Sequence, residues 1–483
     1  MAKKPFSDSA KKSVIFNWAE QLSASRSSWL KRHKYYHACH FRYLRFLIPQ
    51  GKNILALGCG TGDALAQLMP ARGLGVDFSP GMISEAKARH PDLNFLVFDI
   101  EDEDFFQTLD LDFAVDVVLL GDSLGYLDDI QLFLNKLQTI CNSKTRIVSS
   151  YYGYLWEPIL KLSEFLGFRM RSTNTTWLRM GDVGHFFSIT GFECVKKEWR
   201  LLCPFRLLGV GAFFNSFIAT LPLVRRLCIR QYLVARSTTT PQPVKPSISI
   251  AIPCKNECGN IEPAIRRIPD FGVPTEIIFV EGGSTDGTWD EIMRVKDSYP
   301  QKTISFLKQP GRGKGDAVRE AFSNATGDVL MILDADLTVP PEDLPKFYRA
   351  IATGQGEYIN GSRLIYGMEH GAMRTLNFLA NHIFAQVFSY LLNQRITDTL
   401  CGTKVLTRSA YQEIVANRTY FGDFDPFGDF DLIFGASKLN LKFLEIPVRY
   451  GSRKYGVTQI SRFRHGLLLL KMAVMAYRKL KAV

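Results

Sequence analysis

The sequence predicts an α/β protein with two domains. In each half of the chain, short apolar runs alternate with segments of helical character, and a polar residue closes nearly every run. Between the halves lies segment 237–246, which is polar and rich in proline and therefore cannot join a helix or the interior of a sheet. We predict domains at residues 1–236 and 247–483, joined by a linker at 237–246.

Composition narrows the class of protein. A chain of 483 residues with 46% hydrophobic residues is long and apolar enough for two globular cores. The formal charge is +12, and residues 1–50 carry ten Lys/Arg against two acids, while 442–483 carry ten against one. Both basic segments are candidates for contact with lipid, lipid phosphate or nucleic acid, and solvated basic helices are the alternative.

Cysteines and apolar segments predict the compartment. The nine cysteines are scattered without a C-x-x-C pair, which predicts reduced thiols in a cytoplasmic protein. The chain opens on a polar stretch and not on an apolar leader. Segment 207–224 is apolar but includes Asn215 and Pro222 and is only 18 residues long, so we expect a buried or interfacial helix.

The first 50 residues read as basic amphipathic helices that end near Gly51. Segment 29–43 mixes aromatic and cationic side chains. This mixture suits a site for a phosphate-bearing or lipid substrate, and it equally suits a lid packed over the next domain.

A strand, a glycine turn and a helix start follow at residues 53–63. Gly58, Gly60 and Gly62 are spaced G-x-G-x-G, and Asp63 stands where the dinucleotide fingerprint needs its last glycine, which argues against NAD.

Three further strands are predicted at 73–77, 93–99 and 115–122. They close on Asp77, on Asp99 and on the pair Gly121 and Asp122. An acid after the second strand can accept hydrogen bonds from both ribose hydroxyls of an adenosine ligand.

With these four strand ends, residues 50–150 resemble the class I S-adenosylmethionine-dependent methyltransferases, which have a Rossmann-like fold. The resemblance implies that Gly58, Gly60 and Gly62 allow the backbone to approach the methionine part. It further implies that Asp77 binds the ribose, that Asp99 lies near the adenine, and that Gly121 and Asp122 border the transfer site. The family usually has an acid where this chain has Ala56, so a degenerate domain is the alternative.

The rest of this domain gives less information about the acceptor. The aromatic segment 151–158 suits an acceptor pocket, and 186–195 reads as a helix end, a turn and a strand. No general base is assigned.

The second half repeats the alternation. Strands are predicted at 247–254, 275–281 and 329–333, with helices starting near Asn260, at Asp286 or Thr288, and at Asp316. We expect a parallel doubly wound sheet. The last apolar run ends in Asp334 and Asp336, at the carboxyl edge where such sheets bind ligands. Two close carboxylates suit Mg²⁺ or Mn²⁺ bound to a diphosphate, and an Asp-rich turn is the alternative.

Five motifs in order carry a second resemblance. Residues 247–470 resemble the family 2 glycosyltransferases of the GT-A fold, especially the synthases of polyprenyl-phosphate sugars. The motifs lie at 252–257, 280–288, 313–318, 334–342 and 361–363.

The resemblance implies a set of nucleotide-sugar ligands. Pro253 and Glu257 would line the base and ribose, Glu281 would take the place of the first of two family aspartates, and Lys314 would lie against nucleotide or phosphate. Asp334 and Asp336 would bind the metal and the diphosphate. Gly282 replaces the second family aspartate, and Thr338 stands where lipid-phosphate members often have Gln.

The acceptor decides which further residues act. An incoming phosphate is already an anion and needs cations, for which Arg363 and Arg374 are the candidates. A hydroxyl acceptor needs a carboxylate base, and the acidic segment 423–431 offers Asp429 or Asp431.

We therefore predict a bifunctional enzyme. A metal-dependent, inverting glycosyltransferase would transfer a sugar from a nucleotide-sugar to polyprenyl phosphate, and the first domain would transfer a methyl group from S-adenosylmethionine to an unknown acceptor. The alternatives are a glycan hydroxyl acceptor with a degenerate methyltransferase-like domain, and a non-catalytic scaffold. The helix predicted at 375–392 suits the lipid interface, with ordinary packing as the favoured alternative, and 461–483 is predicted to be a basic amphipathic helix. Any membrane contact is expected to be peripheral, at the inner face of the cell membrane. Nucleic acid is not an expected partner.

Overall fold

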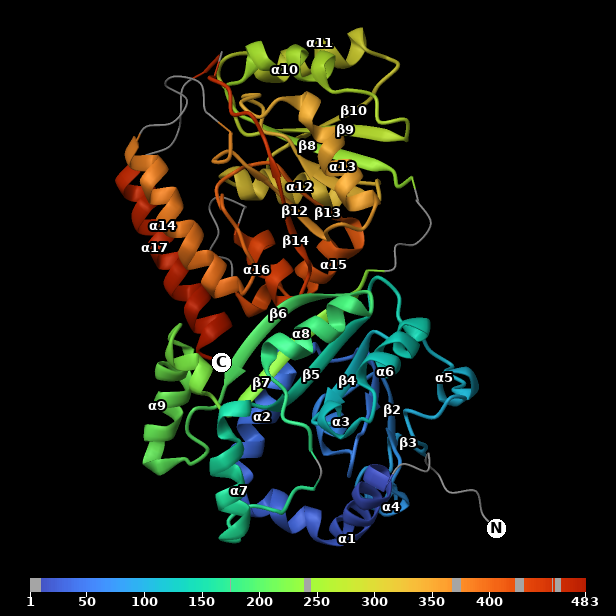
Figure 1. Cartoon of the computed structure of the whole chain (residues 1–483). Coiled ribbons are helices and arrows are strands. Elements are labelled where there is room, and N and C mark those ends of the chain that lie inside the picture. The colour runs from blue at the N-terminus through green and yellow to red at the C-terminus, as the bar shows by residue number, and fades with distance from the viewer. Residues whose placement is uncertain are drawn as a thin grey trace. The chain divides into compact units, whose positions relative to one another are not determined.

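The computed structural model describes residues 10–173, 175–238, 245–366, 375–421, 430–453, 455–456 and 462–483. Contacts divide the chain into an N-terminal unit, Met1–Thr239 with Lys481–Val483, and a C-terminal unit, Thr240–Leu480 (Figure 1). The division falls inside segment 237–246. Ser237, which we predicted to begin the linker, is instead the last residue of a strand.

The N-terminal unit is built on a seven-stranded sheet with the order β3-β2-β1-β4-β5-β7-β6. Among its described strands, β7 alone runs antiparallel to its neighbours, β5 and β6. Strand order reverses at β1, which lies between β2 and β4. The strands are β1 Asn53–Leu57, β2 Arg72–Asp77, β3 Asn94–Val97, β4 Val117–Gly121, β5 Arg146–Tyr152, β6 Phe192–Arg200 and β7 Arg230–Ser237.

Helices cover both faces of this sheet. On one face, α6 and α8 contribute Phe133 and Phe187 to a core that also holds Leu233 of β7. Successive strand residues point to opposite faces, and Tyr232 accordingly packs against Tyr43 of α2 on the other face. The helices are α1 Ala10–Arg32, α2 Lys34–Leu47, α3 Asp63–Gln67, α4 Pro80–Arg89, α5 Phe105–Thr108, α6 Ile130–Leu137, α7 Glu157–Phe165, α8 Met180–Ile189 and α9 Val210–Ser216.

The C-terminal unit has a second seven-stranded sheet, with the order β10-β9-β8-β11-β13-β12-β14. Strands β8 to β11 are parallel, as predicted, and β13 runs antiparallel to β11 and β12. The prediction of an all-parallel sheet was therefore wrong for β13. The strands are β8 Ile248–Cys254, β9 Thr275–Glu281, β10 Thr303–Lys308, β11 Val329–Ile332, β12 Tyr358–Ser362, β13 Lys404–Thr407 and β14 Phe443–Pro447.

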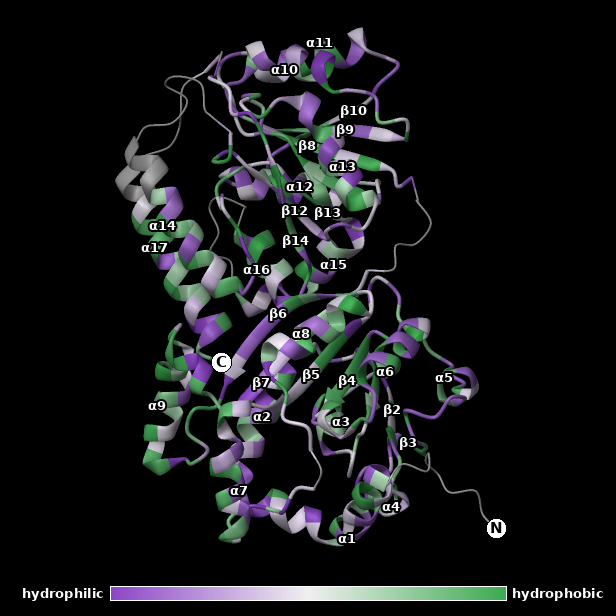
Figure 2. Cartoon of the chain, viewed as in Figure 1, coloured by the Kyte–Doolittle hydropathy of each residue, from purple (hydrophilic) through white to green (hydrophobic). Residues whose placement is uncertain are grey.

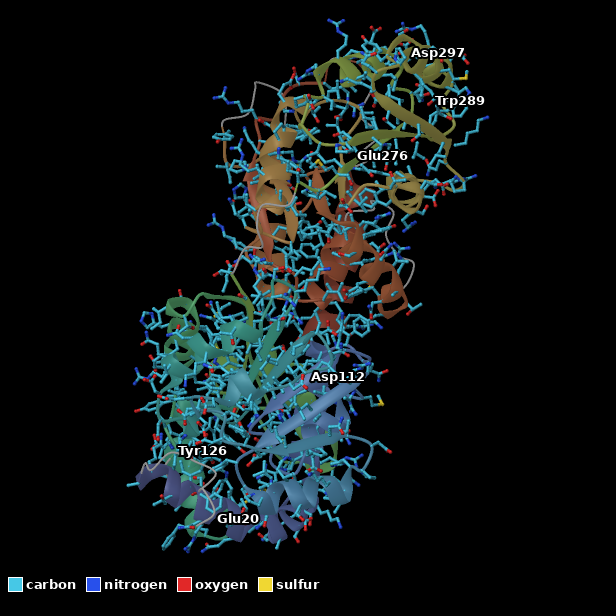
Figure 3. All side chains as sticks on the ribbon, turned by 90° about the vertical axis from the view of Figure 1, so that its right-hand side faces the viewer. Glu20, Asp112, Tyr126, Glu276, Trp289 and Asp297 are labelled. Carbon is cyan, nitrogen blue, oxygen red and sulfur yellow. The ribbon has the colours of Figure 1, made fainter. Side chains whose placement is uncertain are left out.

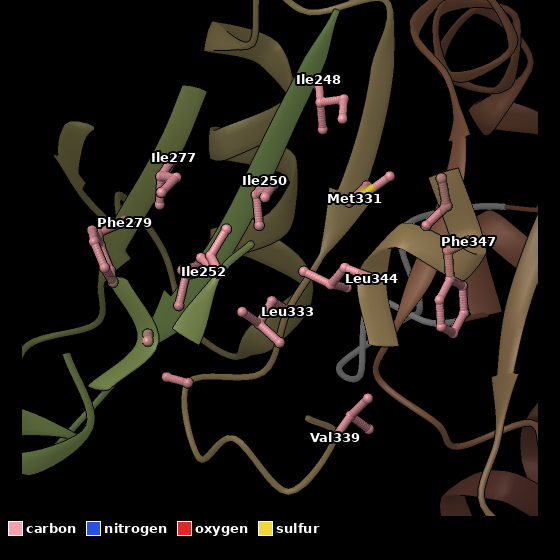
Figure 4. Close-up of a cluster of buried hydrophobic side chains, with 14 of the residues drawn as sticks. Ile248, Ile250, Ile252, Ile277, Phe279, Met331, Leu333, Val339, Leu344 and Phe347 are labelled. Atoms are coloured by element: carbon pink, nitrogen blue, oxygen red, sulfur yellow. The ribbon is translucent and has the colours of Figure 1, made fainter. Parts of the chain in front are cut away.

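Alternation along β8 explains how this sheet is covered. Ile248, Ile250 and Ile252 point to one face and form a core with Phe279 of β9 and Phe347 of α13 (Figure 4). Helices α10 and α11 close the same core, and α12 contacts β8 and β9. The helices are α10 Cys258–Arg267, α11 Thr288–Ser298, α12 Lys314–Asn324, α13 Leu344–Ala352, α14 Thr375–Leu392, α15 Arg408–Ala416, α16 Phe430–Lys438 and α17 Arg462–Ala476.

The apolar segment 207–224 is broken into short pieces. Helix α9 lies between the turns Leu207–Gly209 and Ile218–Thr220. In the part of the chain that the structure describes, no helix has both the length and the apolar character needed to cross a bilayer.

Candidate active sites

Each sheet carries a candidate site where its strand order reverses, which is where open α/β sheets bind ligands. In the N-terminal unit this position is the glycine loop between β1 and α3. Gly58, Gly60 and Gly62 have φ angles of 70°, 53° and 73°, a conformation that favours glycine. A Cβ on Gly58 would lie 2.7 Å from Cβ of Ser123, so this position also has no room for a side chain.

The loop is held by the acid after β2. Asp77 accepts hydrogen bonds from the backbone N–H of Gly60 at 2.8 Å and of Ser79 at 3.1 Å. Burial raises the pKa of Asp77, while these two N–H groups act in the opposite direction. The carboxylate of Asp77, which we predicted to accept hydrogen bonds from the ribose, thus already accepts two from the backbone of the loop and of the start of α4.

A large cavity of about 730 Å³ joins most of the predicted cofactor residues. Six of the seven line it: Gly58, Gly60, Asp77, Asp99, Gly121 and Asp122. Gly62 is not in the lining. A Cβ there would lie 2.7 Å from the ring of Phe95, so this glycine is required by packing beneath the loop.

Helix α1 closes the side of the cavity near Asp99. Lys12 donates to Asp99 at 2.5 Å and lies 3.1 Å from Glu101, and all three side chains are nearly buried. Glu20 accepts a hydrogen bond from the N–H of Gly81 at 3.0 Å and one from the hydroxyl of Ser79. Glu20 of α1 and Tyr126 lie at the same end of the unit (Figure 3).

The carboxyl end of β4 carries an ion pair that the sequence did not indicate, between a buried arginine and a partly exposed aspartate. Asp122, with φ of 60°, accepts two hydrogen bonds from Nη1 of Arg230, at 2.7 and 2.8 Å. Arg230 is 1% exposed, donates to Ser150 at 2.9 Å and lies 4.9 Å from the ring centre of Tyr152. This pair holds the predicted transfer site between β4 and β7.

The remaining wall of the cavity is aromatic and cationic. It includes Tyr152 and Trp156 of the predicted acceptor segment, and Arg26, His33 and His37 of the first two helices. Burial, together with the charges of Arg26 and Arg230, lowers the pKa of His37 to about 3, so its imidazole is neutral near pH 7. Segment 29–43 is thus both a wall of the cavity and a cover for the domain.

In the C-terminal unit, Asp334 and Asp336 follow β11 as predicted. Lys314 lies 2.5 Å from Asp334, and this cation outweighs burial so that the pKa of Asp334 is lowered. Asp336 accepts from the N–H and the hydroxyl of Thr338, at 3.1 and 2.8 Å. The hydroxyl of Thr338 therefore orients Asp336.

Arg453 joins the carboxylates of two motifs. Its Nη2 donates to Asp336 at 2.7 Å and its Nη1 donates to Glu257 at 2.9 Å. Glu257 also accepts from Asn260 at 2.6 Å, and burial raises its pKa. Arg453 was not a sequence candidate, because it lies almost 200 residues from Glu257 and in no recognised motif.

The other residues predicted to bind the nucleotide-sugar lie on β8 and at the end of β9. Pro253 lies in β8 and Glu281 ends β9, where its carboxylate accepts from the N–H of Ser284. A Cβ on Gly282 would lie 2.8 Å from the amide oxygen of Gln309, which occupies the place of a larger side chain.

Of the four predicted acceptor residues, two have other partners and two lie outside the described residues. Arg363 is paired with buried Asp398, at 2.6 and 2.8 Å, and stacks on Tyr450 at 5.1 Å. Asp431, near the start of α16, accepts from Arg418 at 2.9 Å. Arg374 and Asp429 lie outside the described residues.

Carboxylate chemistry at this site fits a hard divalent cation. Within the described residues, no group of three or more His, Cys, Asp or Glu side chains is arranged to hold a metal. Asp334 and Asp336 supply two carboxylates, and their side chains are 28% and 15% exposed. Sites for Mg²⁺ that use one or two carboxylates complete their shell with water and substrate phosphate.

Comparisons with known proteins assign both units. Residues 55–147 match a family model described as a methyltransferase domain, and residues 249–415 match the model of glycosyl transferase family 2. The chain is 38% identical over 122 residues to a dolichol-phosphate mannosyltransferase of Pyrococcus furiosus, covering 25% of this chain and 34% of that protein. It is 27% identical over 242 residues to glycosyltransferase AglJ of Haloferax volcanii, covering 50% and 74%.

The match thus spans about a third of the first of these relatives. Among solved structures, glucosyl-3-phosphoglycerate synthase of Mycobacterium tuberculosis is 18% identical with a TM-score of 0.36, covering 49% of this chain and 80% of that one. The methyltransferase and glycosyltransferase resemblances seen in the sequence are confirmed by the family models. The chain therefore joins a region that matches a methyltransferase domain, residues 55–147, to a region that matches glycosyl transferase family 2, residues 249–415.

Proposed function

We propose that the C-terminal unit transfers a sugar from a nucleotide-sugar to polyprenyl phosphate, with inversion and with a divalent metal. The observation that carries the proposal is the pair Asp334 and Asp336 at the reversal of strand order, ringed by Lys314 and Arg453. The name of the Pyrococcus relative, dolichol-phosphate mannosyltransferase, supports a lipid phosphate as acceptor.

The acidic and the basic residues of the site would have different roles in the displacement of the nucleoside diphosphate. When bound by Asp334 and Asp336, a divalent cation would neutralise charge on the departing nucleoside diphosphate. Lys314 and Arg453 would release these carboxylates and bind phosphate oxygens instead, since both are cations at the same site. The acceptor phosphate oxygen would attack the anomeric carbon from the face opposite the leaving oxygen and invert it.

The pairing of the candidate base Asp431 with Arg418 favours a phosphate acceptor over a hydroxyl acceptor. A phosphate acceptor is an anion and requires no base, whereas a hydroxyl acceptor requires one. Asp431 is 9% exposed at its side chain and paired with Arg418, which does not favour it as a base. Arg363 is held by Asp398, so we assign it a positioning role beside β12, and Arg374 remains the candidate phosphate ligand.

The N-terminal unit would transfer a methyl group from S-adenosylmethionine. This cofactor ends in a carboxylate, and a cation close to the glycine loop would recognise it. Nε of Arg26 lies 3.6 Å from the point where a Cβ of Gly60 would stand, and Arg26 lines the cavity. We assign Arg26 to the cofactor carboxylate, which would strengthen binding where Ala56 replaces the family acid.

Membrane contact of the C-terminal unit is part of the same proposal. Helices α14 and α17 contact each other, and Ile383, Leu467 and Leu470 are exposed on them. An apolar surface with basic neighbours suits the interface of a bilayer that holds the polyprenyl acceptor. We propose a peripheral position at the inner face of the cell membrane.

The glycosyltransferase proposal is tested with purified protein, Mn²⁺, labelled UDP- and GDP-sugars and polyprenyl phosphate. Label should enter the organic phase. Asp336→Ala should reduce this label at least about 100-fold, because the variant lacks one of the two carboxylates that would hold the cation against the leaving diphosphate. Asp297→Ala, on exposed α11, is the matched control and should transfer normally. Donor hydrolysis without lipid label would refute the lipid acceptor.

The cofactor assignment is tested by calorimetry. Arg26→Met should weaken S-adenosylmethionine binding about tenfold or more, as expected for loss of a charged hydrogen bond. Binding of 5′-methylthioadenosine, which has no carboxylate, should be unchanged. Arg72→Met, on the exposed start of β2, is the control. An equal loss of affinity for S-adenosylmethionine and 5′-methylthioadenosine would show that Arg26 supports the fold and does not bind the carboxylate of the cofactor.

A further inference from the structure

The N-terminal unit exposes an unusual concentration of large apolar side chains. More than half of the exposed large hydrophobic residues of the described chain lie in only two segments, 154–168 and 205–227. Figure 2 shows green patches on α7 and α9, which belong to these segments. We call this set the apolar face: Tyr154, Leu155, Ile159, Leu162, Phe165, Leu166, Phe168, Phe205, Leu207, Leu208, Val210, Phe213, Phe214, Phe217, Leu221, Leu223 and Leu227.

The backbone that displays these side chains is fixed by polar contacts. Oδ1 of Asn215 accepts from the N–H groups of Leu202 and Cys203, at 2.8 and 2.9 Å, and its amide donates back to Cys203 at 2.8 Å. Nε1 of Trp156 donates to the carbonyl of Leu227 at 2.7 Å and so ties the two segments together. The apolar groups are therefore held outward by a folded support.

The tips of the apolar face are almost wholly in solvent. Leu208, Leu223 and Phe165 have relative exposures of 106%, 84% and 81%. So many exposed apolar side chains on two segments that are tied together mark an interaction surface, because soluble proteins rarely leave large apolar patches uncovered.

The charged residues near the apolar face are mainly arginines, which favours an anionic partner. Segment 205–227 contains Arg206, Arg225 and Arg226 and no acidic residue. On α7, Glu157 and Glu164 are paired with Lys161 and Arg169. Apolar tips flanked by arginines fit the headgroup region of a bilayer that contains anionic lipid.

The cavity reaches the same surface. Four residues both line the cavity and are exposed at the surface: Ile159 and Phe168 from the first segment and Phe205 and Arg206 from the second. A lipid in the bilayer would thus meet an apolar entrance first and the cationic, aromatic wall behind it.

We propose that the apolar face binds an anionic lipid bilayer, with the cavity of the methyltransferase domain opening toward it. The docking does not depend on either transfer reaction. If the methyl transfer proposed above holds, its acceptor is an amphiphile with an anionic head that enters from the bilayer.

The test is flotation of the full chain with vesicles of phosphatidylcholine, with and without phosphatidylglycerol. The wild type should float with the anionic vesicles. Phe165→Ser/Leu208→Ser/Leu223→Ser should reduce its partition coefficient about tenfold or more, since three large apolar groups no longer leave water. Arg206→Gln/Arg226→Gln should remove much of the preference for anionic lipid.

Controls separate this surface from other parts of the molecule. Leu132→Ser removes a half-exposed apolar side chain from α6 of the same unit and should float like the wild type. Asp336→Ala should also float normally, so failure of sugar transfer is distinguishable from failure of docking. Circular dichroism and S-adenosylmethionine binding show whether the triple variant is folded.

Two results would overturn the proposal. One is a folded triple variant that floats as well as its parent when both also carry Leu467→Ser/Leu470→Ser, which removes apolar side chains of α17 from the comparison. The other is self-association of the wild type without vesicles, abolished in the triple variant with no change in flotation, because the apolar face would then cover a second copy of the chain.

Discussion

Gly402 shows how closely single residues are packed around the carboxylates of the C-terminal site. A Cβ added to it would lie 1.8 Å from Oδ2 of Asp334 and 2.5 Å from Nζ of Lys314. Both atoms would have to shift, and the 2.5 Å pairing of Lys314 with Asp334 would change with them. The absence of a side chain at this position is thus a condition for the charge arrangement of the site.

We expect Gly402→Ala to lower sugar transfer about 100-fold or more, because a displacement of the order of 1 Å in a catalytic group has such an effect. The measurement is label transferred to lipid at saturating donor, together with the thermal unfolding midpoint. Gly466→Ala in α17, where a Cβ meets nothing within 4 Å, is the matched control. Normal transfer by Gly402→Ala would contradict the proposed roles of Asp334 as a cation ligand and of Lys314 as a phosphate ligand.

At the scale of elements, one buried ion pair joins the end of β12 to the segment before β13. Asp398 is fully buried and accepts from the backbone N–H and the guanidinium of Arg363. Burial alone would raise the pKa of Asp398, but Arg363 outweighs it and the pKa is lowered. A lowered carboxyl pKa contributes stability above its unfolded value near 4, and this contribution is lost as pH falls through the folded value.

We therefore expect Asp398→Asn to destabilise the C-terminal unit by about 3–5 kcal/mol at pH 7, since it leaves a buried guanidinium without its anion. The difference from the wild type should shrink as the pH falls below 4, because Asp398 then binds a proton in the unfolded wild type and the contribution of the pair declines. Urea unfolding at a series of pH values measures both quantities. A difference that stays constant down to pH 3 would contradict the lowered pKa.

At the scale of the whole molecule, two complete α/β units share one chain, and each has its own sheet, core and site. Each candidate site is built from residues of one unit. The two proposed reactions should accordingly be separable by mutation.

We expect Asp336→Ala to bind S-adenosylmethionine like the wild type, and Arg26→Met to retain sugar transfer to lipid within about twofold, which is the scatter of independent sites. Both assays on the same preparations measure this. Loss of sugar transfer in a folded Arg26→Met protein would contradict independent sites.

Much of both candidate sites could be predicted because its signals are local. An apolar run followed by an acid identifies a strand and its carboxyl end, and this placed Asp77, Asp99, Asp334 and Asp336 correctly at the edges of the two sheets. Glycine spacing similarly identified the loop at Gly58 and Gly60. These features depend on neighbouring residues, so sequence reasoning can reach them.

Other features depend on pairings between distant segments. Apolar runs do not reveal strand direction, so the reversed strands β7 and β13 were missed. Arg230 and Arg453 find their partners 108 and 117 residues away, and no motif marks either of them.

The sequence by itself determined the two domains, the order of their motifs and the acids at their strand ends. Tertiary structure alone decided which cations meet those acids: Lys12, Arg230, Lys314 and Arg453. The physical reason is that buried or partly buried carboxylates require counter-charges, and only the arrangement of strands and helices in space determines which side chain of the chain comes within reach.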